Sequence, residues 1–211
     1  MPLFLVMIFL AGCVPTEGRD FKSPDLKLLM AAGTSPSEVR ALYGEPFSQS
    51  INSGHSQLPP GLKTPDNIAL LTGSRENIRY RYQRGLNSKS FTLLFVDGKL
   101  ADYAVHGNFP DLSTDFDETK VPLLVKGKTK KSEVIALLGP PSGVSVFPAI
   151  SERNETVFHY SYSEPTPPSR VSDKHLDARF DSNDTLLDFN FQKDSGPIIR
   201  PLESLLRQYR N

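Results

Sequence analysis

The sequence of 211 residues has one cysteine, no tryptophan and no excess of charge of either sign. The lone cysteine, Cys13, cannot form an intramolecular disulfide. Lys and Arg together number 24, and so do Asp and Glu, so the composition gives no electrostatic reason to bind nucleic acid. The apolar run at the N-terminus is shorter than the ~20 residues that a transmembrane helix needs. These absences argue against a disulfide-stabilised fold and against a nucleic-acid-binding protein.

Familiar catalytic and nucleotide-binding motifs are missing as well. Gly127-Lys128-Thr129 resembles the end of a P-loop, but Pro122 stands where that motif needs a glycine. The nucleophile-elbow sequence Gly-x-Ser-x-Gly does not occur. The histidines lack the spacing of metal ligands, although His159 and His175 fall on neighbouring predicted strands. We therefore predict no enzyme activity, metal, cofactor or small-molecule substrate. A hydrolase with a site built from loops is the less favoured alternative, and a Ser-His-Asp assembly, which only geometry reveals, stays open.

The N-terminus indicates a secreted lipoprotein. Residues 1–10 are almost wholly apolar, and the Leu10-Ala11-Gly12-Cys13 that follows resembles a bacterial lipobox, in which the cysteine is acylated. The run departs from the usual pattern because no Lys or Arg precedes it, and the alternative is an apolar segment buried in the fold. We predict a signal peptide over residues 1–12, a tether over residues 13–24 and a palmitate-type anchor at Cys13. Val14 is not acidic, which favours the outer membrane, with the domain facing the periplasm.

A short stretch that occurs twice organises the rest of the chain. Residues 39–46 and 134–141 share the pattern Val-x-x-Leu-x-Gly-x-Pro. In each copy the apolar residues lie at i, i+3 and i+4, as on one face of a helix, and a glycine and a proline then end the helix. The glycines are Gly44 and Gly139, and Thr34, Ser35 and Thr129 suit the N-caps. The repetition predicts a duplicated unit.

Matching strand patterns follow both copies. They lie at 78–82, 91–95 and 100–103 after the first copy, and at 158–162, 176–180 and 186–189 after the second. The predicted fold class is α+β, with two tandem units that each form a short helical hairpin followed by a three-stranded antiparallel meander. The predicted units span 25–110 and 121–196, with a linker at 111–120 and a C-terminal helix at 197–211. Residues 47–77 indicate a long loop that either folds back on the core or contacts a partner.

Strand alternation assigns side chains to two faces of each sheet. Ile78, Tyr80 and Tyr82, with their counterparts Phe158, Tyr160 and Tyr162, should cover the helices. The other face mixes charged and polar residues, so it is either a partner-binding surface or a plain solvated one. The candidates for partner binding on it are Arg79, Arg81, His159 and Arg179. Asp102 and Asp188 occupy equivalent positions of the repeat, which favours a structural role over a catalytic pair.

The combined pattern of glycine, Ser/Thr cap, Val-x-x-Leu-x-Gly-x-Pro, aromatic strand and Asp-Gly-type hairpin resembles the SmpA/OmlA lipoproteins. These are the BamE-like small subunit of the outer-membrane β-barrel assembly machinery. The resemblance covers residues 25–106 and 121–192 separately, whereas family members usually hold one unit. A tandem of the unit also resembles the fold of the β-lactamase inhibitor protein. Both relatives imply a non-enzymatic module that binds envelope proteins, in outer-membrane assembly or envelope integrity, or alternatively an inhibitor of a periplasmic enzyme.

Overall fold

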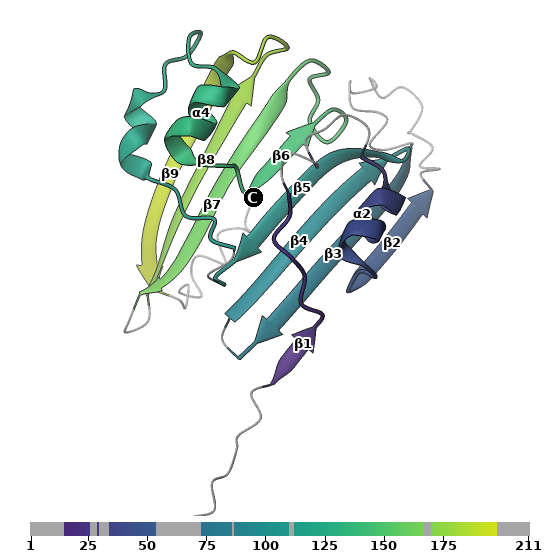
Figure 1. Ribbon diagram of the computed structural model, residues 1–211. Coiled ribbons are helices and arrows are strands. Elements are labelled where there is room, and N and C mark those ends of the chain that lie inside the picture. Colours follow the sequence, from purple (N-terminus) through teal and green to yellow (C-terminus); the bar gives the residue numbers. More distant parts are fainter. Residues whose placement is uncertain are drawn as a thin grey trace, which may run out of the picture.

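The strands of this protein join into one antiparallel sheet (Figure 1). The computed structural model describes residues 15–25, 29, 34–53, 73–85, 87–109, 112–166 and 170–197. Nine strands pair in the order β1-β3-β4-β5-β6-β7-β8-β9, and β2 also pairs with β3. The elements are β1 (Thr16–Gly18), α2 (Pro36–Tyr43), β2 (Ser48–Ser53), β3 (Ser74–Arg84), β4 (Asn87–Val96), β5 (Lys99–Gly107), the 3-10 helix η1 (Glu118–Leu123), α4 (Lys131–Leu138), β6 (Gly143–Val146), β7 (Thr156–Thr166), β8 (Arg170–Phe180) and β9 (Leu186–Pro197).

The predicted fold class, with two units that each form a helical hairpin and a three-stranded meander, is wrong. In the described residues helix is confined to α2, η1 and α4, apart from the helical residue Leu29, and the strands form a single sheet. A further strand follows each helix: β2 pairs with β3, and β6 pairs with β7. Because β6 also pairs with β5, the two halves share one sheet.

The physical reason for the missed strands is that their sequences carry little pattern. Every side chain of β2 is exposed, so no alternation of apolar residues marks it, and its backbone pairing with β3 alone defines it. Strand β6 has only four residues. The predicted loop at 47–77 therefore contains β2 and the start of β3, while residues 54–72 lie outside the described residues.

The repeated helix ends have the predicted geometry. Ser35 caps α2 in a capping box with Glu38, whereas Thr129 caps no helix, because Lys130 is the N-cap of α4. Gly44 and Gly139 have φ angles of 78° and 83°, which the C-cap position requires of glycine. The hydroxyls of Tyr80 and Tyr160 donate to the carbonyls of these glycines, at 2.9 and 3.0 Å.

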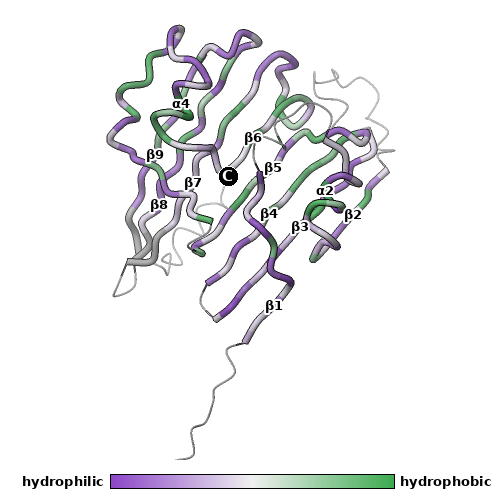
Figure 2. Tube along the Cα trace, viewed as in Figure 1, coloured by the Kyte–Doolittle hydropathy of each residue, from purple (hydrophilic) through white to green (hydrophobic). Residues whose placement is uncertain are grey.

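One core lies between the sheet and the helices. Figure 2 shows apolar positions (green) recurring along the strands and in α2. The predicted inward face is confirmed, since Ile78, Tyr80, Phe158 and Tyr160 are buried and Tyr82 and Tyr162 are half-buried. One row of paired residues crosses the sheet from β3 to β9: Ile78, Leu93, Tyr103, Val144, Phe158, Ala178 and Phe189. Helices α2 and α4 each insert a fully buried valine into this core, Val39 and Val134.

The chain ends fall outside this description. The predicted signal peptide, the predicted anchor at Cys13 and almost all of the predicted C-terminal helix lie outside the described residues. Among the described residues, the helices are too short or too polar for any of them to span a bilayer. The predicted linker contributes the first residues of η1, and its side chains Asp115 and Glu118 form ion pairs with Lys174 of β8.

Candidate functional site

The predicted partner-binding residues all lie on the sheet face opposite the helices, but they do not form one cluster. Arg79 and His159 belong to one cross-strand row, in which Thr92, Ala104 and Gly143 stand between them. Four strand spacings of about 4.8 Å therefore separate the two residues. The row places one basic residue in each half of the molecule.

The other two candidate arginines already have partners on the sheet. Arg81 forms an ion pair with Glu17 at 3.2 Å and lies over the ring of Phe47. Arg179 donates to Glu155 from Nε and Nη2, at 3.1 and 2.6 Å. These pairs fix both side chains on the surface, and neither arginine reaches His159 in the interactions of the described residues.

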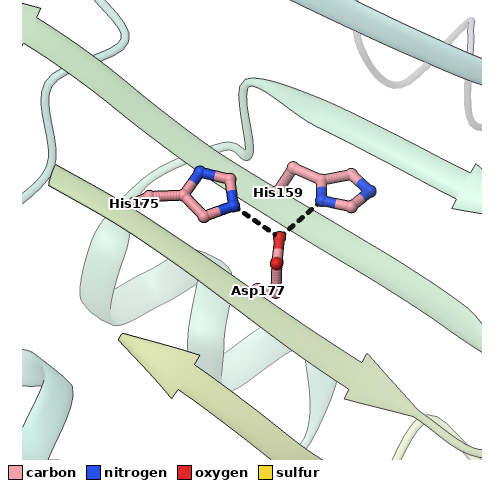
Figure 3. Close-up of side chains that lie close together, drawn as sticks. All are labelled: His159, His175 and Asp177. Carbon is pink, nitrogen blue, oxygen red and sulfur yellow. Dashed lines mark hydrogen bonds and ion pairs between the residues drawn. The ribbon is translucent and has the colours of Figure 1, made fainter. Parts of the chain in front are cut away.

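His159 instead belongs to a chain of hydrogen bonds that crosses four neighbouring strands. Asp102 of β5 accepts from the Ser145 hydroxyl of β6, at 2.5 Å. Ser145 Oγ lies 2.8 Å from His159 Nε2, and His159 Nδ1 lies 2.6 Å from Asp177 Oδ1. His175 Nε2 approaches the same oxygen at 3.0 Å. Figure 3 shows the two imidazoles converging on the Asp177 carboxylate from either side.

Strand register explains this convergence. Asp102 is paired with Ser145, and His159 is paired with Asp177, so each pair projects from one face at directly opposed positions. His175 precedes Asp177 by two residues on β8, which puts both on the same face. Gly143, the partner of His159 on β6, is needed for the approach of β5, because a Cβ there would lie 2.8 Å from the Tyr103 carbonyl oxygen.

The hydrogen bonds between these residues constrain which atoms donate and which accept. The Ser145 hydroxyl has one hydrogen, which it donates in a hydrogen bond to Asp102. Ser145 Oγ can then only accept from His159, which requires a hydrogen on Nε2. His159 Nδ1 faces the Asp177 carboxylate, which accepts a hydrogen bond when that nitrogen carries its hydrogen. The hydrogen bond from His159, helped by the charges of His159 and His175, lowers the pKa of Asp177 although burial opposes this.

Ser145, His159 and Asp177 have the contact order of a catalytic triad, but the surroundings do not suit hydrolysis. Ser145 is only 6% exposed, and its hydroxyl is bonded to Asp102. It also lies within a strand that is paired on both sides, rather than on a sharp turn that presents the hydroxyl beside free backbone amides. The Ser145 hydroxyl is therefore neither exposed nor presented as that of a nucleophile elbow is.

A polar hollow of about 250 Å³ lies beside these hydrogen-bonded residues, on the same face of the sheet. Burial and the nearby charge of Arg79 lower the pKa of His106, which lines the hollow. The remaining lining comes from both halves and is largely hydroxyl-bearing: Ser88, Ser90, Gly107, Asn108, Thr114, Ser161 and Ser163. The hollow is therefore a polar depression to which both halves contribute side chains.

Part of this site was visible in the sequence. His159 and His175 were expected on neighbouring strands, and the structure confirms this. Ser145 and Asp177 were not singled out; the pattern His-x-Asp at 175–177 opposite His159 is the signal that could have found Asp177. Asp102 and Asp188 do not act together, because Asp188 pairs with Lys126 at the surface while Asp102 bonds to Ser145.

Comparisons with known proteins leave the family of this chain open. The chain matches no protein-family model, and no curated protein resembles it in sequence. Among solved structures it is similar to a "putative beta-lactamase inhibitor protein" from Streptococcus mutans, at 13% sequence identity and a TM-score of 0.45. The match covers 82% of this chain and 90% of that one. No match to the SmpA/OmlA family accompanies it.

Proposed function

We propose that this protein is a non-enzymatic lipoprotein of the cell envelope that binds another protein through the open face of its sheet. A lipid at Cys13 anchors it to the periplasmic side of the outer membrane. There it acts in outer-membrane protein assembly or envelope integrity. The single observation that carries the binding role is that the described helices all lie on the opposite face (Figure 1), which leaves a broad polar sheet surface uncovered by them.

The composition of the open face supports protein binding. Its central row runs from the exposed Arg79 through the small residues Thr92, Ala104 and Gly143 to the half-buried His159. The small residues leave room for a partner's side chains. Arg79 and His159, at the two ends of the row, offer hydrogen-bond donors to a partner's carboxylates. Both the small residues and the hydrogen-bond donors suit non-covalent binding.

An inhibitor of a periplasmic enzyme is the second candidate. The same sheet face would bind the enzyme, because the surface around an active site and the surface of an assembly subunit can both be covered by a flat sheet. The identity of the bound protein separates the two functions.

The test is site-specific photo-cross-linking of the full chain in living cells. A photoreactive residue at Thr92, in the central row, should form adducts with a partner protein, and one at the exposed Ser132 of α4 should not. Adducts with barrel-assembly subunits would support the assembly role, and adducts with a soluble periplasmic hydrolase the inhibitor role. Equal adducts from both positions, or none from Thr92, would refute binding through the open face.

A charge variant completes the experiment. Arg79→Glu should reduce the Thr92 adduct several-fold, because it places a repulsive charge beside a surface that favours acidic groups. Lys128→Glu, an equally exposed lysine that precedes α4 on the helix side, is the matched control and should leave the adduct unchanged.

A further inference from the structure

We propose that His159, His175 and Asp177 form a binding site for a divalent transition-metal ion of the zinc class. The three residues each offer one ligand atom, and these atoms lie within 4.8 Å of one another. Two imidazoles and one carboxylate are ligands that zinc accepts, and three protein ligands leave a fourth, open position. The site goes beyond the proposed function and does not depend on it.

The distances suit an ion after small movements. His159 Nδ1 and His175 Nε2 now lie 2.6 and 3.0 Å from Asp177 Oδ1, as hydrogen-bonded groups do. Tetrahedral coordination with bonds of ~2.0 Å separates ligand atoms by roughly 3.3 Å, so the side chains need to move by on the order of 1 Å. Each side chain is between 32% and 43% exposed, which leaves the open position accessible to water.

An outer shell already orients the first ligand. Metal-binding histidines usually donate their second N–H to a neighbouring acceptor, which fixes the ring and its tautomer. His159 Nε2 lies 2.8 Å from Ser145 Oγ, and Ser145 in turn donates to Asp102. Ser145 is buried and comes from a different strand, so the nitrogen that faces Asp177 is presented by the fold and not by a surface rotamer.

The charge of the site also favours a cation. Asp102 and Asp177 bring two negative charges to this chain of hydrogen bonds. A divalent ion held between the two imidazoles and Asp177 would compensate these two negative charges. Any hydrogen on a ligating nitrogen leaves to solvent as the ion binds, and no oxidation or reduction is involved.

The duplication supplies an internal comparison. Strand register makes Arg79, Ser90 and Thr92 of the first half equivalent to His159, His175 and Asp177 of the second. The three equivalent positions of the first half therefore lack these ligands, although the strand pairing there is equivalent. A structural role common to both halves does not explain these three residues.

The test is metal binding by the full chain with Cys13→Ala, which removes the lone thiol as a competing ligand. Zn²⁺ titrated calorimetrically should bind with one ion per chain, and Co²⁺ should give the visible absorption of a four-coordinate site. His175→Ala and Asp177→Asn should each weaken binding by at least tenfold, because each removes a ligand. Ser145→Ala should weaken it by about tenfold through loss of the orientation of His159.

His106→Ala is the matched control, since it removes another histidine of the same face outside the cluster. It should leave affinity and stoichiometry unchanged, and circular dichroism should show each variant folded. Binding that survives in His175→Ala, that falls equally in His106→Ala, or that is weaker than millimolar in the unmodified cluster would overturn the proposal.

Discussion

At the residue scale, two tyrosines tie a strand to a helix end in each half. Tyr80 and Tyr160 lie at the same point of the repeat, and both donate to the glycine that ends the preceding helix. Burial raises the pKa of Tyr80 to about 12, so the hydroxyl remains a donor at neutral pH. The sequence pattern marked the glycines and the tyrosines separately, and only the folded chain shows that they bind each other.

Removing one of these hydroxyls should destabilise the fold. Tyr160→Phe should lower the free energy of unfolding by about 1 kcal/mol, because the Gly139 carbonyl loses its donor. Urea denaturation should show a lower midpoint with an unchanged slope. Tyr103→Phe is the control: its hydroxyl is buried without a hydrogen-bond partner among the described residues, so its removal should be neutral or stabilising. The opposite ranking of the two variants would contradict this account.

The buried lysine of β4 offers a second test at this scale. Lys89 is 3% exposed, pairs with Asp20 at 2.8 Å and lies over the ring of Phe21. Asp20→Asn should destabilise the protein by about 1–2 kcal/mol, because it leaves a buried charge with less compensation. Lys89→Met should be close to neutral, since an apolar chain of similar length suits the site. Thermal unfolding of both variants measures the difference; equal losses would show that burial of the charge is unimportant.

At the scale of elements, the sequence predicted the features that depend on neighbouring residues and missed the strand that depends on pairing with a distant strand. Helix α2, its capping box and both glycine caps follow from residues within one or two turns of each other. The hairpin at Asp97 and Gly98 was equally local, and both residues have the positive φ angles that a two-residue turn demands. Strand β2 could not be predicted, because its side chains, Ile51 included, are all exposed and only its pairing with β3 makes it a strand.

The linker element carries a prediction about pH. The hydrogen bond from Lys193, with the charges of Lys193 and Lys174, holds the pKa of Glu118 below its ordinary value of 4.5 against the effect of burial. Because the folded pKa is lower than the unfolded one, this stabilisation is present above pH 4.5 and is lost as the pH falls through the folded pKa. Glu118→Gln should therefore have a lower Tm than the parent at pH 7.

Calorimetry between pH 7 and pH 3 should show that difference in Tm closing below pH 4.5. The exposed Glu152 is the control, because it accepts a hydrogen bond from the neighbouring Ser151 within one loop, and Glu152→Gln should follow the parent at every pH. A gap between parent and Glu118→Gln that stays constant with pH would contradict the assignment.

At the scale of the whole molecule, the pairing of β5 with β6 makes one sheet of two halves. Only three residue pairs join these strands, and Ser142 adds a further link by accepting from Val105 and donating to the His159 carbonyl. The candidate site lies at this junction, because Asp102 comes from the first half and the other members come from the second. The strands that join the two halves, β5 and β6, therefore also carry part of the candidate site.

The predicted lipid anchor is tested at the same scale. Cys13→Ala should move the protein from the membrane fraction to the soluble fraction, because it removes the only residue that could be acylated at the lipobox. Cell fractionation with immunoblotting measures this, and the circular dichroism spectrum of the soluble variant should show a folded sheet. A variant that still sediments with membranes would refute the anchor at Cys13.

The sequence by itself determined the repeat, the helix ends, the inward face of the strands and the expectation of a lipoprotein, since each rests on spacing within a short segment. Tertiary structure alone decided that the two halves share one sheet and that Asp102, Ser145, His159 and Asp177 meet on it. The physical reason is that strand register is set by packing of the whole sheet against its core, and a shift of one residue would move every one of these side chains to the other face.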